Sequence, residues 1–151
     1  MKTIYIVGAQ GYIGSFLAEF MKADNLCNDE IILVSRSADP QKHFVELPKV
    51  IKKNSICILL AGSTGEKFCN SNKSIAFQNN VDFVSQILDL GFEKIIYTST
   101  TSLYGTTELA ASENSEIKIS SYYTETKFRA EEMLLNSKIN CSVLRLSIVI
   151  G

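Results

Sequence analysis

The chain has 151 residues, of which 46% are hydrophobic, and a formal net charge of −1. A chain of this size and apolar content can bury one core, so we expect a single domain over residues 1–151. The balanced charge excludes the basic surface typical of proteins that bind nucleic acid or anionic membranes. The apolar runs are too short for a membrane span or a secretory signal, so we expect a cytoplasmic protein.

Short β-branched runs alternate with amphipathic stretches along the sequence. This rhythm predicts an α/β fold with a parallel sheet covered by helices on both faces. The segment before the third strand is too short for the extra strand and helix that a complete dinucleotide-binding fold places there, so we expect one strand to be missing or vestigial. Strands are predicted at 3–7, 31–35, 55–60, 94–99 and 141–147, and helices at 12–23, 44–53, 74–89 and 121–136.

A run of spaced glycines stands between the first predicted strand and the first predicted helix. Gly8 would let the strand turn sharply, Gly11 would let the backbone approach a pyrophosphate, and Gly14 would let the helix pack closely on the strand. The first helical amides, at Tyr12 and Ile13, would face the phosphates. Such spacing alone is also found in ordinary tight turns. Its place between strand and helix predicts a dinucleotide site in a doubly wound fold of Rossmann type.

A second pattern pairs Tyr123 with Lys127 on a predicted helix. The spacing of four puts the phenol and the ammonium on one helical face. A phenol with a pKa of about 10 is a poor base at neutral pH, and a nearby ammonium together with an oxidised nicotinamide could stabilise its anion. The hydroxyl-rich segment 98–101 could polarise a substrate oxygen. Alone, the pair is more typical of surface packing, but beside the glycine turn it indicates a catalytic pair.

Together these motifs resemble the extended short-chain dehydrogenase/reductase superfamily, in its branch of sugar-nucleotide epimerases, dehydratases and reductases. The resemblance runs through nearly the whole chain. It is carried by the glycine turn, the strand end Leu60-Ala61-Gly62, the helix led by Asn80, the segment from Tyr97 to Gly105, the pair Tyr123 and Lys127 followed by Glu131, and Leu144-Arg145.

The resemblance implies a role for each of the matching residues. Counting back from Gly105 by the family's Ser/Thr-x-x-x-Tyr-Gly pattern makes Thr100 the catalytic hydroxyl, with Ser99 and Thr101 as alternatives. Tyr123 would then be the acid/base group, and Lys127 would both assist it and bind the cofactor's ribose. The residues after the third strand, Leu60, Ala61 and Gly62, would line the nucleotide.

The end of the second strand bears on the choice of cofactor. Relatives that prefer NAD usually carry an acidic residue there, whereas this chain has Ser35 followed by Arg36. An arginine can pair with a 2′-phosphate in two-pronged fashion, so the sequence favours NADP(H), with NAD(H) still open. The alternative is that Arg36 is a solvated charge at a strand end.

The resemblance also implies the substrate and the assembly. A nucleotide-linked sugar is the expected substrate, reduced or epimerised rather than dehydrated, because Thr101-Ser102 replaces the Asp-Glu pair typical of dehydratases. A homodimer through the helices at 74–89 and 121–136 is expected. Relatives continue beyond Gly151 into a substrate-binding region, so we expect a fragment of a longer enzyme. The alternative is a non-catalytic NADP(H)-binding module that senses redox state or scaffolds a partner.

The four cysteines suggest neither a disulfide nor a metal site, because no CxxC pair or histidine cluster accompanies them. Cys57 and Cys141 fall in strand-like runs, and Cys27 and Cys69 in polar loops. We expect reduced, structural thiols.

Overall fold

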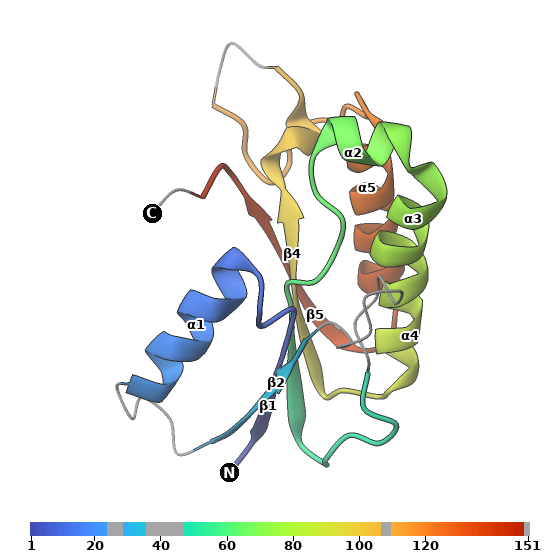
Figure 1. The fold of residues 1–151 in the computed structure, drawn as a ribbon. Helices are drawn as coiled ribbons and strands as arrows, with labels where there is room; N and C mark the ends of the chain where they lie inside the picture. Colours follow the sequence, from blue (N-terminus) through green and yellow to red (C-terminus); the bar gives the residue numbers. More distant parts are fainter. Residues whose placement is uncertain (24–28, 36–46, 107–109, 150–151) are drawn as a thin grey trace.

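Five strands form one parallel sheet in the computed structural model, which describes residues 1–23, 29–35, 47–106 and 110–149 (Figure 1). The order across the sheet is β2-β1-β3-β4-β5. The five predicted strands are confirmed to within one residue at either end. The strands are β1 (Thr3–Val7), β2 (Glu30–Val34), β3 (Ser55–Leu59), β4 (Lys94–Thr100) and β5 (Asn140–Leu146).

Helices lie on both faces of this sheet, as Figure 1 shows. The helix α1 (Tyr12–Ala23) covers one face. The other face carries α2 (Glu66–Ser71), α3 (Lys73–Phe77), a π-helical turn (Gln78–Asp82), α4 (Phe83–Asp89) and α5 (Tyr122–Leu135), while a 3₁₀ turn (Thr101–Tyr104) follows β4. The fold is therefore the predicted Rossmann-type α/β fold.

Alternate residues of β1 contribute to the two halves of the core. Ile4 and Ile6 pack towards α1, whereas Tyr5 and Val7 belong to the larger cluster under α4 and α5. All five residues of β1 are buried. A strand covered on both faces needs apolar residues at every position, which explains the continuous apolar runs in the sequence.

The helix predicted at 74–89 is present, but it is part of a longer helical region. Helix α2 precedes it from Glu66, and Asn72 separates α2 from α3. The π-helical turn then interrupts the helix around Asn80. Such turns insert an extra residue into an α-helix and often occur at functional sites.

The helix predicted at 44–53 is wrong over residues 47–53, and 44–46 lie outside the described residues. Leu47 and Ile51 pack against the core, whereas Val50 is 82% exposed. In a helix these three side chains would share one face. Packing of the segment on the sheet therefore overrides the helical spacing of its apolar residues.

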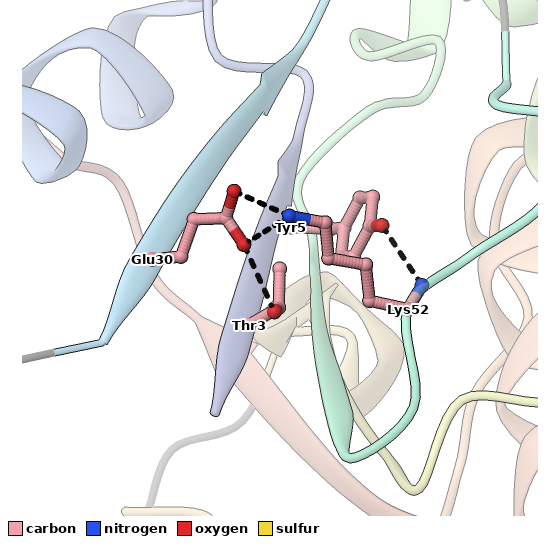
Figure 2. Close-up of polar contacts among 4 residues, drawn as sticks. All are labelled: Thr3, Tyr5, Glu30 and Lys52. Atoms are coloured by element: carbon pink, nitrogen blue, oxygen red, sulfur yellow. Dashed lines mark hydrogen bonds and ion pairs between the residues drawn. The ribbon is translucent and has the colours of Figure 1, made fainter. Parts of the chain in front are cut away.

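Polar contacts explain how this segment is held, as Figure 2 shows. The backbone N–H of Lys52 donates to the hydroxyl of Tyr5 at 3.1 Å, so it is not used in a helix. The Lys52 ammonium lies 2.6 Å from both carboxylate oxygens of Glu30, which also accepts from the Thr3 hydroxyl at 3.2 Å. The segment is thus tied to β1 and β2. Residues 47–54 form no strand, and the rest of the compressed region, 36–46, lies outside the described residues.

Three thiols fall within the described residues. Cys57 in β3 and Cys69 are buried, and Cys141 in β5 is half-buried. Cys69 lies in α2 and not in the polar loop that we predicted, while Cys27 lies outside the described residues. Across the described ranges, no helix is long and apolar enough to cross a bilayer, and no cluster of three or more His, Cys, Asp or Glu side chains could hold a metal ion.

Candidate active site

The glycine turn between β1 and α1 contains two kinds of position. Packing requires glycine at two positions, and the third adjoins open space. Gly8 has a φ of +96°, and a Cβ there would lie 2.7 Å from the backbone nitrogen of Ala61. A Cβ on Gly14 would lie 2.8 Å from the Cα of Ala9. Both positions therefore require glycine for packing. A Cβ on Gly11 would meet only the carbonyl oxygen of Gly8, at 3.3 Å, and otherwise open space.

That open space is what the backbone approach of a pyrophosphate needs, so the turn fits the phosphates of a dinucleotide. Helix α1 begins at Tyr12, and its first amides have no partners within the helix. The ring of Tyr12 is 49% exposed and packs edge-to-face on Phe16, with 5.3 Å between ring centres. Ile13 is half-buried.

The carboxyl ends of three strands meet at this turn. The backbone amides of Leu60 and Ala61 both donate to the carbonyl of Val7, at 2.9 and 3.0 Å, and the amide of Gly8 donates to Val34 at 2.8 Å. Leu60 and Ala61 are half-buried, and Gly62 is exposed. Ser35, which follows β2, is half-buried. Arg36 lies outside the described residues. The predicted nucleotide-lining segments are thus brought together at one edge of the sheet.

Asn80 holds the loop after β3, a role that the sequence analysis did not assign. Its side-chain oxygen accepts from the amide of Ser63 at 2.6 Å, and its nitrogen donates to the Ser63 carbonyl at 3.0 Å and to the Thr126 hydroxyl at 2.9 Å. Asn80 is 2% exposed. A Cβ on Gly62 would lie 2.8 Å from the Asn80 oxygen. Asn80 therefore joins the loop after β3, which is predicted to line the nucleotide, to α5.

The end of β4 distinguishes the three candidate hydroxyl groups. The Thr100 hydroxyl lies close enough to the phenol of Tyr123 to lower its pKa, and it accepts from the amide of Ser102 at 3.1 Å. The hydroxyl of Ser99 is buried and has no hydrogen-bond partner among the described residues, and that of Thr101 donates to the Leu146 carbonyl at 3.4 Å. Of the three, Thr100 is the residue that the structure brings to Tyr123.

Helix α5 presents Tyr123 in its first turn because of how the helix begins. Ser121 and Thr124 form a capping box, in which the Ser121 hydroxyl accepts from the Thr124 amide at 3.2 Å and the Thr124 hydroxyl accepts from the Ser121 amide at 3.0 Å. The amide of Tyr122 donates to the Asn70 side chain at 2.9 Å, which fixes the helix start against α2.

Lys127 is buried one helical turn after Tyr123. Its ammonium donates to the Thr98 carbonyl at 2.7 Å and lies 4.3 Å from the centre of the Tyr97 ring. Burial lowers the pKa of Lys127 to about 7, against the opposing effects of Glu131 and Cys69. Near neutral pH, Lys127 is thus able to gain or lose a proton.

The environment of Tyr123 differs from the one we expected. Burial raises the pKa of its phenol, although the hydrogen bond from Thr100 acts in the opposite direction. The ammonium of Lys127 is directed to the Thr98 carbonyl. In this state Tyr123 is a proton donor at neutral pH.

Comparison with profiles of protein families shows which family the chain belongs to. The profile of the NAD dependent epimerase/dehydratase family matches residues 4–151. The chain belongs to this family. That membership confirms the resemblance seen in the motifs. The matched part includes the glycine turn, Thr100, Tyr123 and Lys127. Comparison with curated proteins gives no match.

Solved structures of the same fold cover nearly all of the chain. A protein named RMD from Pseudomonas aeruginosa, solved with NADPH, has a TM-score of 0.81 and 18% identity over 97% of this chain and 53% of its own. A UDP-glucuronic acid 4-epimerase from Bacillus cereus, solved with UDP-glucuronic acid and NAD, has a TM-score of 0.74 and 19% identity over 96% and 56%. A UDP-glucose 4-epimerase from Brucella ovis, solved with NAD, has a TM-score of 0.73 and 20% identity over 96% and 51%. The chain spans about half the length of these proteins.

Proposed function

We propose that the chain carries the cofactor-binding and proton-transfer parts of an NADP(H)-dependent enzyme that reduces or epimerises a nucleotide-linked sugar. The observation that carries this proposal is the position of the Thr100 hydroxyl at the end of β4, where it lowers the pKa of the Tyr123 phenol, with Lys127 one turn further along α5. Thr100 is the last residue of β4, at the same carboxyl edge of the sheet where the glycine turn leaves room at Gly11. Ligands of open α/β sheets bind at this edge.

Each side chain has a chemical task in this proposal. The cofactor supplies or accepts a hydride. Tyr123 gives a proton to a sugar keto oxygen, or takes one from the hydroxyl, while Thr100 hydrogen-bonds that oxygen. Lys127 holds the ribose and supplies the positive field that would lower the pKa of Tyr123. The turn from Gly8 to Gly14, with Leu60, Ala61 and Gly62, holds the rest of the nucleotide.

NADP(H) is the proposed cofactor because Ser35 stands where a carboxylate would select the 2′-hydroxyl of NAD, and a guanidinium follows it in the sequence at Arg36. A carboxylate would repel a 2′-phosphate, whereas arginine pairs with it. The relatives leave this open, since RMD was solved with NADPH and the two epimerases with NAD.

Calorimetric titration of the chain with NADPH and with NADH tests two parts of the proposal: that the chain binds a dinucleotide, and that it prefers NADP(H). NADPH should bind about ten- to a hundredfold more tightly, and Arg36→Ala should remove most of that difference, because one charge-assisted hydrogen bond is lost. Arg129→Ala, which removes an exposed arginine of α5, should leave the preference unchanged. Equal affinities would contradict the NADP(H) assignment, and failure to bind either nucleotide would contradict the proposed function.

We also propose that the helices at 74–89 and 121–136 form a homodimer interface, as the family resemblance implies. A groove at these helices is lined by Val81 of the π-helical turn, by Arg129, Glu132 and Met133 of α5, and by Asn136, which follows α5. Leu135, also on α5, is 62% exposed. Light scattering should give a dimer for the chain and a monomer for Met133→Asp, and a monomer for both would contradict this interface.

A further inference from the structure

A buried carboxylate lies close to the buried amine of the site. Glu131 follows Lys127 by one turn of α5 and is 1% exposed. Arg145 of β5 contacts both of its oxygens, with Nε at 3.0 Å from Oε1 and Nη2 at 2.6 Å from Oε2. The remaining nitrogen, Nη1, donates to the hydroxyl of Tyr104 at 2.8 Å.

This network joins the elements that carry the three proposed catalytic residues. Glu131 is on the helix of Tyr123 and Lys127, and Tyr104 ends the 3₁₀ turn that follows Thr100. Arg145 pairs with Ser99 in the register of β4 and β5. A two-pronged arginine contact is more rigid than a single ion pair, so it fixes the distance between helix and strand.

The geometry also determines where the Lys127 ammonium points. A buried carboxylate without a cation is costly, and residues four apart on a helix are neighbours. If Arg145 did not occupy both oxygens of Glu131, Lys127 would be the next cation available to it. Instead, the ammonium donates to the Thr98 carbonyl and lies over the Tyr97 ring. Among the described residues, the titratable groups around Lys127 are Cys69 of α2, Tyr97 of β4 and Glu131 itself.

We propose that Arg145 is a positioning residue, which keeps Glu131 away from Lys127 so that the ammonium stays at the Thr98 carbonyl, on the strand that ends in Thr100, instead of turning to Glu131. The proposal deepens the proposed function, since it rests on the role given there to Lys127. It assigns a purpose to Glu131 and Arg145 that goes beyond holding α5 on the sheet.

The test is the pH titration of the Lys127 side chain in the cofactor-free chain. The midpoint of the titration is measured by nuclear magnetic resonance of ¹³C,¹⁵N-labelled lysine. Arg145→Met should raise the midpoint by about one pH unit, because Glu131 then pairs with Lys127. Glu131→Gln should lower it, because the carboxylate that favours the ammonium is lost while Arg145 keeps its charge. The double variant removes both charges and should return the midpoint close to that of the parent chain.

The matched control is Arg129→Met, which breaks the exposed pair of Arg129 and Glu125 on the same helix. It should leave the midpoint unchanged. If the role of Arg145 were purely structural, Arg145→Met would lower the thermal stability, but the Lys127 midpoint would not shift in opposite directions in the two single variants and return in the double variant. An unchanged midpoint in folded Arg145→Met would overturn the proposal. If Arg145→Met does not fold, an unchanged midpoint in Glu131→Gln, or a displaced one in the double variant, would overturn it.

These results are independent of the proposed function because no cofactor is present in the titration. The same variants titrated with NADPH give the second readout. Arg145→Met should weaken NADPH binding, and the double variant should recover it. If NADPH does not bind the parent chain, the proposed function is contradicted. If NADPH binds but the Lys127 midpoint is unchanged in Arg145→Met, only the proposed role of Arg145 is contradicted.

Discussion

The ammonium of Lys127 donates a 2.7 Å hydrogen bond to the main-chain carbonyl of Thr98. The carbonyl belongs to β4, two residues before Thr100, so the backbone of the strand fixes the position of the amine relative to the proposed catalytic hydroxyl. A single backbone carbonyl does not replace the water that an ammonium loses on burial. Lys127 is therefore held in place but is easily deprotonated.

We predict that the stability of the chain rises with pH between 7 and 8.5. Burial lowers the pKa of Lys127 from 10.5 to about 7 in the folded chain. Between these values the unfolded chain carries a proton that the folded chain lacks, so unfolding takes up a proton and its free energy increases with pH. The contribution is at most about 1.4 kcal/mol per pH unit. Urea unfolding at several pH values measures it.

Lys127→Met is the control for this dependence, because it keeps most of the apolar stem and cannot titrate. Its stability should be flatter over the same window. The window ends below pH 9, where the buried thiol of Cys57, whose pKa is raised by burial, begins to act in the opposite direction. Equal slopes for the parent chain and Lys127→Met would show that the amine is not titrating as described.

The glycine turn gives a paired prediction. Gly14→Ala should destabilise the fold by about 1–3 kcal/mol, because its Cβ would overlap the turn at Gly8 and Ala9. Gly11→Val should leave the fold intact and abolish binding of NADPH, because its side chain fills the space left for the pyrophosphate. Circular dichroism and calorimetry on both variants separate the effects. Normal NADPH binding by Gly11→Val would mean that the turn is only structural.

Asn80 provides a test of how the nucleotide-lining loop is held. Asn80→Leu removes three buried hydrogen bonds, two of them to Ser63. It should cost about 1–3 kcal/mol for each polar group left buried without a partner, and should weaken NADPH binding because the loop moves. Asn79→Ala, which removes a single 3.0 Å bond to the Ser63 hydroxyl, is the matched control. The same loss in both variants would argue against a special role for Asn80.

Much of the fold follows from local patterns in the sequence. The glycine spacing predicted a sharp turn at Gly8 and close packing at Gly14; the structure has a φ of +96° at Gly8 and no room for a Cβ at Gly14. The five strands were recognisable because buried parallel strands are apolar at nearly every position. Local spacing failed at 47–53, where the bond from Lys52 to Tyr5 and the exposure of Val50 reflect contacts with distant strands.

The site was less accessible to sequence reasoning, because its contacts join distant segments. Asn80 bonds Ser63 and Thr126, which are 17 and 46 residues away, and nothing near Asn80 in the sequence marks these partners. Thr100 could not be separated from Ser99 and Thr101 by composition, since all three carry hydroxyls. The family's pattern selected Thr100, and only the structure shows which of the three side chains acts on Tyr123.

The most direct test is the effect of Tyr123→Phe on the turnover of the full-length enzyme, measured by nicotinamide absorbance under single-turnover conditions with 4-keto sugar nucleotides. We predict a decrease of about 10²–10⁴-fold with little change in NADPH affinity, because the variant loses the proton donor but keeps the cofactor contacts. Tyr122→Phe, at the neighbouring position of α5, should retain the turnover of the parent chain. If Tyr123→Phe turns over a substrate that the parent chain converts, at the same rate, Tyr123 is not the acid/base group and the account is contradicted.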